Sequence, residues 1–318
     1  MPVSAQISQV ILKSGQWNAA KKELMQAALP TAAQAESVRT QGSLAGRRRR
    51  VMIDVGASTG FFSLLAAARG YDVVALEPVR EQAVRILASA EGNGFGTMAP
   101  ASSASSAEVR AAAKAWRSRR EGVAKTEETA VLAREADVAA GRDPSVALPH
   151  AAGSIVVLRN AASDGSEPMA AHGFDKNPGA TSMAPLDGAP SLRGAALPEG
   201  ATAWSVPLDG LAGLGLFRPD EVAAIKISAE GMDCKVLNGM RALLREGRPP
   251  VVQLVFNNDH VTQHGCDTSG LLSTLLQWGY RVYDFGLYRS KKAEVLKMAA
   301  GWGQRSTELT LVEQSVRL

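Results

Sequence analysis

The chain has 318 residues, of which 46% are hydrophobic and 21% are charged, a composition typical of a globular protein and not of a disordered chain. The formal net charge is +4 and the isoelectric point is about 9.1, but much of the excess lies in local blocks such as the four arginines at residues 47–50. Aromatic residues make up only 5% of the chain, so no platform for stacking bases is expected, and nucleic acid is not a predicted partner.

The sequence contains no apolar run of the roughly 18 residues that a membrane-spanning helix needs. The N-terminal segment lacks the short apolar core of a secretory signal, and its only acids, Glu23 and Glu36, leave an organelle transit peptide open. Two cysteines, Cys234 and Cys266, are too few for a disulfide framework, which favours a reducing compartment. The sequence therefore predicts a soluble protein of the cytoplasm by default, with organelle import left open.

The first predicted elements form a strand–helix–strand unit. Residues 1–50 have the pattern of an amphipathic helical lead-in. Residues 51–55 and 71–76 are apolar runs of strand length, and residues 61–69 and 79–90 have the pattern of helices. A strand, a glycine turn, a helix, a strand and a helix in this order build a parallel sheet with right-handed crossovers.

Two stretches interrupt this rhythm. Residues 97–150 are rich in Ala and Ser, and residues 107–140 have the composition of a polar helix without a sustained apolar face, which predicts a partly disordered surface insertion. The strand pattern returns at residues 154–158. Residues 163–203 are rich in Gly and Pro and too long for an ordinary connection, which favours a substrate-side lid or a flexible loop.

The C-terminal part returns to alternating strands and helices. Strands are predicted at residues 223–227, 251–256, 281–285 and 308–313, and helices at residues 233–244 and 271–278. Alternation of this kind predicts the α/β class with a doubly wound, mostly parallel sheet. The chain is therefore predicted to be one domain over residues 51–318 that carries two loose insertions.

The strongest signal for function lies at the first glycine turn. Residues 54–60 read D-V-G-A-S-T-G, and Glu77 ends the next predicted strand. Glycines let the chain turn tightly from strand to helix and let a ligand approach the backbone at the carboxyl edge of the sheet. An acid at the end of the second strand accepts hydrogen bonds from both ribose hydroxyls of an adenosyl group. The pattern predicts an adenosyl site, and a turn whose glycines serve packing alone is the alternative.

Two other nucleotide-binding fingerprints do not fit this turn. Gly56 and Gly60 are spaced G-x-x-x-G, whereas nicotinamide-dependent enzymes have G-x-G-x-x-G. No Gly-Lys-Ser or Gly-Lys-Thr follows, so a P-loop is excluded.

Several motifs, in the same order along the chain, resemble the FkbM family of methyltransferases that depend on S-adenosylmethionine (SAM). The resemblance begins with I-D-V-G-A-S-T-G-F-F-S-L at residues 53–64, Glu77-Pro78 and N-G-F at residues 93–95. It continues with N-A-A-S-D-G at 160–165, V-P-L-D-G-L at 206–211, I-K-I-S-A-E-G at 225–231 and V-L-N-G at 236–239. It covers about residues 51–96 and 153–285, and the ordered series is far more specific than any one motif.

The resemblance implies a class I methyltransferase fold, which is Rossmann-like and doubly wound, with a mostly parallel seven-stranded sheet whose last strand is antiparallel. It implies SAM as the cofactor and transfer of its methyl group, commonly to a hydroxyl oxygen of a small molecule or a glycan. Glu77 is placed at the ribose, and Asn160 and Ala161 near the adenine. The residues that the family pattern places around the methionine end of SAM are Asp54, Gly56, Ala57, Gly60 and Phe61.

The sequence departs from the family pattern at the edge where catalysis is expected. Ser228 stands where the family has an Asp, and Val255 lies where a family strand often carries a Glu. The remaining candidate catalytic residues are Glu230, Lys226 and His260, of which Glu230 is the first choice as a general base for an alcohol acceptor. Glu230 has a second interpretation, as a carboxylate near the N-terminus of the following helix.

Other interpretations remain open. The two missing acids also fit a divergent FkbM-like protein that binds SAM weakly or not at all and acts as a regulatory module. A different transferase or a nucleotide-dependent oxidoreductase on a similar fold, and a basic RNA-binding protein, are further alternatives. His260 and His264 have the i, i+4 spacing of metal ligands, but no Glu follows the first of them, so no metal is predicted. The acceptor and the oligomeric state are not predicted.

Overall fold

The structure, a computed structural model, describes residues 51–99, 107–120, 153–172, 181–186, 202–257, 265–283 and 306–315. The predicted lead-in at residues 1–50 lies outside these ranges, and so do His260 and His264.

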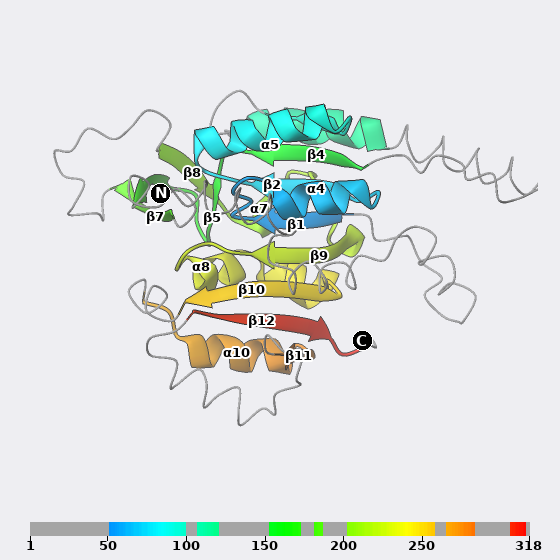
Figure 1. The fold of residues 1–318 in the computed structure, drawn as a ribbon. Coiled ribbons are helices and arrows are strands. Elements are labelled where there is room, and N and C mark those ends of the chain that lie inside the picture. The colour runs from blue at the N-terminus through cyan, green and yellow to red at the C-terminus, as the bar shows by residue number, and fades with distance from the viewer. Residues whose placement is uncertain are drawn as a thin grey trace, which may run out of the picture.

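The described chain is built around a sheet of eight strands (Figure 1). All adjacent pairs are parallel except those of the last strand in the sequence, which is antiparallel to both its neighbours. The predicted α/β class with a mostly parallel sheet is thus confirmed. In spatial order the strands are β11 (Tyr280–Tyr283), β12 (Ser306–Glu313), β10 (Val251–Asn257), β9 (Val222–Ile227), β1 (Val51–Val55), β2 (Asp72–Leu76), β4 (Ser154–Leu158) and β3 (Gly96–Met98).

The number of strands in the sheet and the extent of one helix differ from the prediction. The short strand β3 pairs in parallel with β4 and brings the sheet to eight strands, so the prediction of seven was wrong. Its Gly-Thr-Met sequence carries no apolar run, and only pairing with β4 makes it a strand. The predicted helix at residues 233–244 is also divided, because α8 (Asp233–Asn238) ends early and is followed by a π-helix, η4 (Leu243–Gly247).

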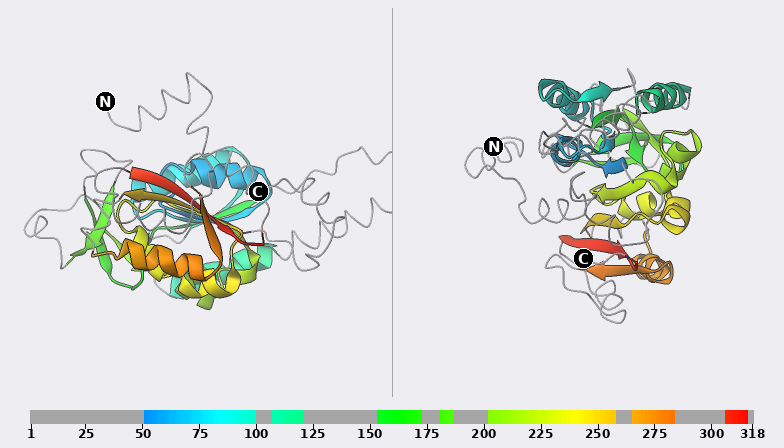
Figure 2. Two further views of the ribbon diagram at one scale, coloured as in Figure 1. Left: turned by 90° about the horizontal axis from the view of Figure 1, so that it is seen from below. Right: turned by 90° about the vertical axis from the view of Figure 1, so that its right-hand side faces the viewer.

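Helices cover both faces of the sheet (Figure 2). On one face α4 (Phe61–Ala68) and α5 (Arg80–Gly92) pack on Met52, Val73 and Ala75. On the other face α7 (Leu208–Gly213), α8 and α10 (Thr268–Gln277) belong to the same core cluster as Ile53 and Val74. Successive residues of a strand point to opposite faces, so a strand that is apolar almost throughout contributes to both core layers. A 3-10 helix, η3 (Pro219–Glu221), lies just before β9 and buries no side chain.

Residues 107–120 form a helix that belongs to the core. Val109, Ala113 and Trp116 are each about 1% exposed and pack in the same cluster as Ile53. The Trp116 indole N–H donates to the Ser154 hydroxyl at 2.8 Å. The prediction that this stretch lacks an apolar face was therefore wrong here, because a stripe of only three residues at i, i+4 and i+7, one of them an alanine, is enough to bury the helix.

A second, smaller sheet stands where a lid or loop was predicted. Its order is β5-β8-β6-β7, with β5 and β8 parallel and the other pairs antiparallel. Figure 1 shows it beyond the arrowheads of the large sheet, at the carboxyl ends of the parallel strands. The loop prediction for residues 163–203 was wrong for β6 (Pro168–His172), for β7 (Ser182–Pro185) and for the start of β8 (Thr202–Val206), whereas β5 (Ala161–Ala162) lies just before this stretch.

The two cysteines are paired with each other. Cys234 of α8 forms a disulfide with Cys266, just before α10, and their Cα atoms are 6.0 Å apart. The small number of cysteines favoured a reducing compartment, but the structure pairs the two, and Cys234 packs in the core, where it is 5% exposed.

In the described ranges, no helix combines the length and the apolar character that crossing a lipid bilayer requires.

Candidate functional site

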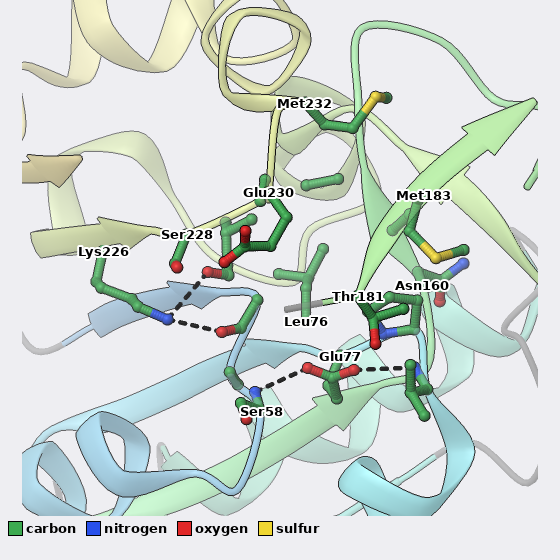
Figure 3. Close-up of a pocket in the computed structure, with 18 of the residues that line it drawn as sticks. Ser58, Leu76, Glu77, Asn160, Thr181, Met183, Lys226, Ser228, Glu230 and Met232 are labelled. Carbon is green, nitrogen blue, oxygen red and sulfur yellow. Dashed lines mark hydrogen bonds between the residues drawn. The ribbon is translucent and has the colours of Figure 1, made fainter. Parts of the chain in front are cut away.

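A cavity of about 210 Å³ lies at the carboxyl ends of β1, β2 and β9 (Figure 3). Its floor is the glycine turn after β1, and one wall is the turn between β9 and α8. Thr181 and Met183, at the start of β7, bring the small sheet to the opposite wall. The carboxyl edge of a parallel sheet is where α/β proteins commonly bind ligands, which makes this cavity the candidate site.

The glycine turn has a backbone that only small residues allow. Gly56 has φ +67° and Gly60 has φ +83°, both in the left-handed region. A methyl group on Gly56 would overlap the main-chain carbonyl oxygen of Ser228. The N–H groups of Gly56 and Ala57 donate to the carbonyl of Leu76 at 3.0 and 3.1 Å, which ties the turn to the end of β2.

Glu77 connects the glycine turn to the start of α5. One carboxylate oxygen accepts the N–H of Ser58 at 2.7 Å, and the other accepts the N–H of Val79 at 2.9 Å. The side chain is 5% exposed, and burial raises the pKa of Glu77 to about 7, although both hydrogen bonds and the nearby Lys226 ammonium oppose the shift. Each oxygen of a carboxylate can accept a second hydrogen bond. Glu77 can therefore accept two ligand hydroxyls at the cavity while it holds the turn.

Lys226 of β9 contacts the glycine turn and Asp54 through its ammonium group. Its ammonium donates to the carbonyls of Gly56 at 2.6 Å and Val55 at 3.3 Å, and it lies 3.1 Å from a carboxylate oxygen of Asp54. The other carboxylate oxygen of Asp54 accepts the Ser63 hydroxyl at 2.7 Å. Because its ammonium is engaged by oxygens of Val55, Gly56 and Asp54, the geometry gives Lys226 a part in holding the turn.

The turn between β9 and α8 is held by side chains instead of by glycines alone. Glu230 has φ +48°, which is rare outside glycine and costs about 1 to 3 kcal/mol unless the surroundings enforce it. The Asp233 carboxylate accepts the N–H of Ala229 at 3.2 Å and of Gly231 at 3.1 Å. Ser182 of β7 donates its hydroxyl to the carbonyl of Glu230 at 2.8 Å. Two separate elements therefore fix the position of Glu230.

Asp233, at the first residue of α8, has no exposed surface, and burial raises its pKa to about 6, against the pull of its backbone hydrogen bonds. It is also the acid in the first turn of the helix. The interpretation of Glu230 as the carboxylate at the start of this helix was therefore wrong, because Asp233 holds that position.

Asn160 and Ala161 follow β4 and line the cavity beside Glu77. The Asn160 amide donates to the carbonyl of Trp204 in β8 at 3.1 Å, so the small sheet sets its orientation.

The structure brings most of the sequence-predicted residues to one place. Asp54 and Gly60 are not among the lining residues. Asp54 lies buried beneath the turn, and Gly60, which precedes α4, packs against Ile86 of α5. Ser228 lines the cavity, and the predicted candidate His260 lies outside the described residues. The predicted residues that line the cavity are Gly56, Ala57, Phe61, Glu77, Asn160, Ala161, Lys226 and Glu230.

Sequence reasoning missed Thr181, Met183 and Met232, which complete the cavity wall. Met183 and Met232 pack in one buried cluster of the small sheet. No motif marks them, because their place depends on contact between segments far apart in the sequence.

A comparison with known protein families finds no matching family model, and a comparison with curated proteins finds no match. Any functional conclusion therefore depends on the geometry of the cavity and on the motifs that surround it.

Proposed function

We propose that this chain binds SAM in the cavity and transfers its methyl group to a hydroxyl-bearing small molecule or glycan. The observation that carries the proposal is the position of Glu77. This acid ends β2, lies beside the glycine turn after β1, and presents two carboxylate oxygens to the cavity. An adenosyl group offers two neighbouring ribose hydroxyls, which are the donors that such a carboxylate accepts.

The arrangement around Glu77 fits the rest of an adenosyl ligand. The residues after β4, Asn160 and Ala161, offer an amide and an apolar surface next to Glu77, where an adenine ring would lie. The absence of a side chain at Gly56 lets the glycine turn lie against the main chain of Ser228, so that both turns border the same cavity. The strand order also supports the proposal, since β12 is the last strand, lies between β10 and β11, and is antiparallel to both, as in the sheet expected of a class I methyltransferase.

Bound SAM supplies a methyl group on a positively charged sulfur, which an oxygen nucleophile attacks in line. The residues of this chain would bind and orient the two partners, and orientation alone accounts for a large part of such a rate increase. Glu77 would hold the ribose, and the glycine turn would hold the other end of the cofactor. The small sheet, through Thr181 and Met183, would close the cavity against water.

A second candidate function is a SAM-binding protein without methyl transfer. The observation in its favour is that Ser228 lines the cavity where the family pattern has an acid, while Lys226 is engaged by the turn. Such a protein would bind SAM through the same residues, so turnover separates the two functions.

The first experiment is calorimetric titration with SAM and with S-adenosylhomocysteine (SAH), using the full chain and a Glu77→Ala variant. We expect micromolar binding that falls at least about tenfold in the variant, because hydrogen bonds to a charged group contribute about 1.5 to 3 kcal/mol. Glu81→Ala is the matched control, since Glu81 lies one turn away on α5 with 56% of its side chain exposed. Its binding should equal that of the wild type.

The two outcomes lead in different directions. Binding that depends on Glu77 justifies a screen for methyl transfer to hydroxylated small molecules and glycans. Absence of binding to the wild-type chain contradicts the proposed function outright.

A further inference from the structure

Lys226 is the cation among the described residues that line the cavity (Figure 3). Its ammonium donates to the carbonyl of Gly56, which belongs to the floor of the cavity, at 2.6 Å. The Lys226 side chain is 8% exposed, so water and salt screen its charge poorly. Because like charges repel strongly where little water separates them, an isolated ammonium at this place would oppose the binding of a second cation.

SAM would bring such a second cation into the cavity. It has a sulfonium, an α-ammonium and a carboxylate, and therefore carries one positive charge in excess. SAH lacks the transferred methyl group and its sulfur is neutral, so its charges cancel. The two ligands share nearly all their contacts and differ in charge, which means that the ratio of their affinities reports the electrostatic character of the cavity.

Asp54 lies against Lys226 beneath the glycine turn. One of its carboxylate oxygens is 3.1 Å from the Lys226 ammonium, and the Asp54 side chain has no exposed surface. The two residues stand opposite each other in the pairing of β1 with β9, so the register of the sheet brings them together. The Ser63 hydroxyl donates to the other carboxylate oxygen at 2.7 Å, which favours the ionised form of Asp54. The ammonium of Lys226 is therefore balanced by a fixed negative charge.

The other neighbours of the Lys226 ammonium carry no full charge. The carbonyls of Val55 and Gly56 accept its hydrogen bonds but contribute only their dipoles. On the far side of Lys226 in the sheet lies Gln253 of β10, which is buried and uncharged. In the part of the chain that the structure describes, Asp54 is the anion that forms an ion pair with Lys226.

Both charges of the pair act on a residue that lines the cavity. Burial is the main cause of the raised pKa of Glu77, which its backbone hydrogen bonds to Val79 and Ser58 oppose. Lys226 lowers this pKa further and Asp54 raises it. The influence of Asp54 thus extends into the cavity, although Asp54 itself is not one of the lining residues.

We infer that Asp54 determines the selectivity of the cavity for a cationic ligand, because it cancels the charge of Lys226. Asp54 acts through Lys226 and does not contact the ligand. The inference rests on the proposed function, since SAM is the cationic ligand in question. It explains how a cavity with a lysine at its floor can hold a sulfonium, and it gives Asp54 an electrostatic part in place of the contact with the methionine end that the sequence predicts.

The test is calorimetric titration of the full chain and of Asp54→Asn with SAM, SAH and sinefungin. Asparagine keeps the size of the side chain and can still accept a hydrogen bond from Lys226, but it leaves the ammonium without a counter-charge. We expect the affinity for SAM to fall at least about tenfold relative to that for SAH. Sinefungin, in which a carbon that bears an ammonium replaces the methylated sulfur, should follow SAM.

Two further variants separate charge from structure. Lys226→Gln in the Asp54→Asn background removes the ammonium as well, so the ratio of SAM to SAH affinity should return to within about twofold of the wild-type ratio. Asp54→Ser is a second neutral variant, which should show the same altered ratio as Asp54→Asn and serves as the test if Asp54→Asn does not fold.

Asp72→Asn is the matched control. The Asp72 carboxylate is also largely buried and lies 2.9 Å from a cation, the Arg120 guanidinium, but Asp72 begins β2, at the opposite end of that strand from the cavity. This variant should lose stability and keep the wild-type ratio of SAM to SAH affinity.

Two results would overturn the inference. Equal losses for SAM and SAH in the neutral Asp54 variants would give Asp54 a structural part alone. An altered ratio that Lys226→Gln does not restore would show that the ammonium is not its cause. If the wild-type chain binds none of the three ligands, the proposed function fails and the inference with it, whereas an unchanged ratio in variants that still bind SAM and SAH contradicts the inference alone.

Discussion

The two turns that border the cavity are built in different ways. The turn after β1 contains two glycines with positive φ, Gly56 and Gly60, and is also held by the side chains of Glu77 and Lys226. The turn after β9 places a glutamate, Glu230, in the same left-handed region and depends on Ser182 and Asp233 to keep it there. The first turn lies against the main chain of Ser228, and the second places a charged side chain at the cavity. The comparison shows that a left-handed backbone can be reached through glycine, without a steric cost, or through a larger residue in a turn that hydrogen bonds from other elements hold in place.

The largest expected effect comes from breaking the first turn. Gly56→Ala should lower the free energy of unfolding by about 4 kcal/mol, because the left-handed φ and the overlap with the Ser228 carbonyl both oppose a methyl group. Urea denaturation measures the loss. Gly94→Ala is the control, since Gly94 has φ +73° but open space around it, so only about 1 kcal/mol should be lost. Equal losses for the two variants would contradict the close approach at Gly56.

The second effect concerns the carboxylate that supports the first turn. The folded pKa of Glu77 is about 7, above the ordinary value of 4.5, so the fold binds its proton more tightly than the unfolded chain does. The stability that this proton contributes is present below pH 4.5 and is lost as the pH rises to 7. Glutamine does not titrate, so the free energy of unfolding of Glu77→Gln should rise relative to that of the wild type by up to about 3 kcal/mol between pH 4.5 and 7. Melting temperatures of both proteins from pH 4 to 8 test this, and parallel curves would rule it out.

The third effect concerns the carboxylate that supports the second turn. Asp233→Ala leaves the N–H groups of Ala229 and Gly231 without their acceptor, which destabilises the fold. Because the variant no longer buries a carboxylate, part of this cost is offset, and we expect the free energy of unfolding to fall by about 2 kcal/mol. Binding of SAM should weaken as well, because Glu230 loses its support. Asp209→Ala is the control, since that carboxylate accepts the N–H groups of Ala242 and Leu243, both at 2.9 Å, away from the cavity. Asp209→Ala should lose stability and keep its affinity for SAM. If Asp209→Ala also binds SAM more weakly, the loss of affinity in Asp233→Ala follows from lost stability and not from the β9–α8 turn.

The smallest effect sharpens the comparison by making the second turn resemble the first. Glu230→Gly should raise the free energy of unfolding by about 1 kcal/mol, because glycine adopts φ +48° without strain. The same variant should bind SAM more weakly than the wild type. Chemical denaturation and calorimetry on one preparation measure both quantities, and a variant that is less stable than the wild type would show that Glu230 serves folding.

The elements that could be predicted from the sequence are those whose own residues decide them. The strands β1 and β2 each have four apolar residues out of five and are followed by turn residues, and Glu77 stands at a fixed distance from a glycine turn. The strands of the small sheet could not be predicted in this way. Sequences such as P-M-A-A-H in β6 and S-M-A-P in β7 have little intrinsic preference for extended structure, and only pairing with each other and with β8 makes them strands.

The same reason explains what was missed at the site. Thr181 and Met183 reach the cavity through β7, and Ser182 meets Glu230 across 48 positions of sequence. The pairing of Cys234 with Cys266 likewise depends on α8 and the start of α10 lying side by side. Contacts of this kind are decided by packing, which a local pattern does not contain.

The disulfide has a consequence for the integrity of the chain. It joins Cys234 to Cys266, 32 positions apart, and the segment between them contains β10, which lies between β9 and β12 in the large sheet. A peptide bond cut anywhere between the two cysteines therefore leaves the N-terminal and C-terminal pieces in one covalent molecule. Such a nicked protein keeps its mass, apart from the added water, until a reductant separates it into two fragments.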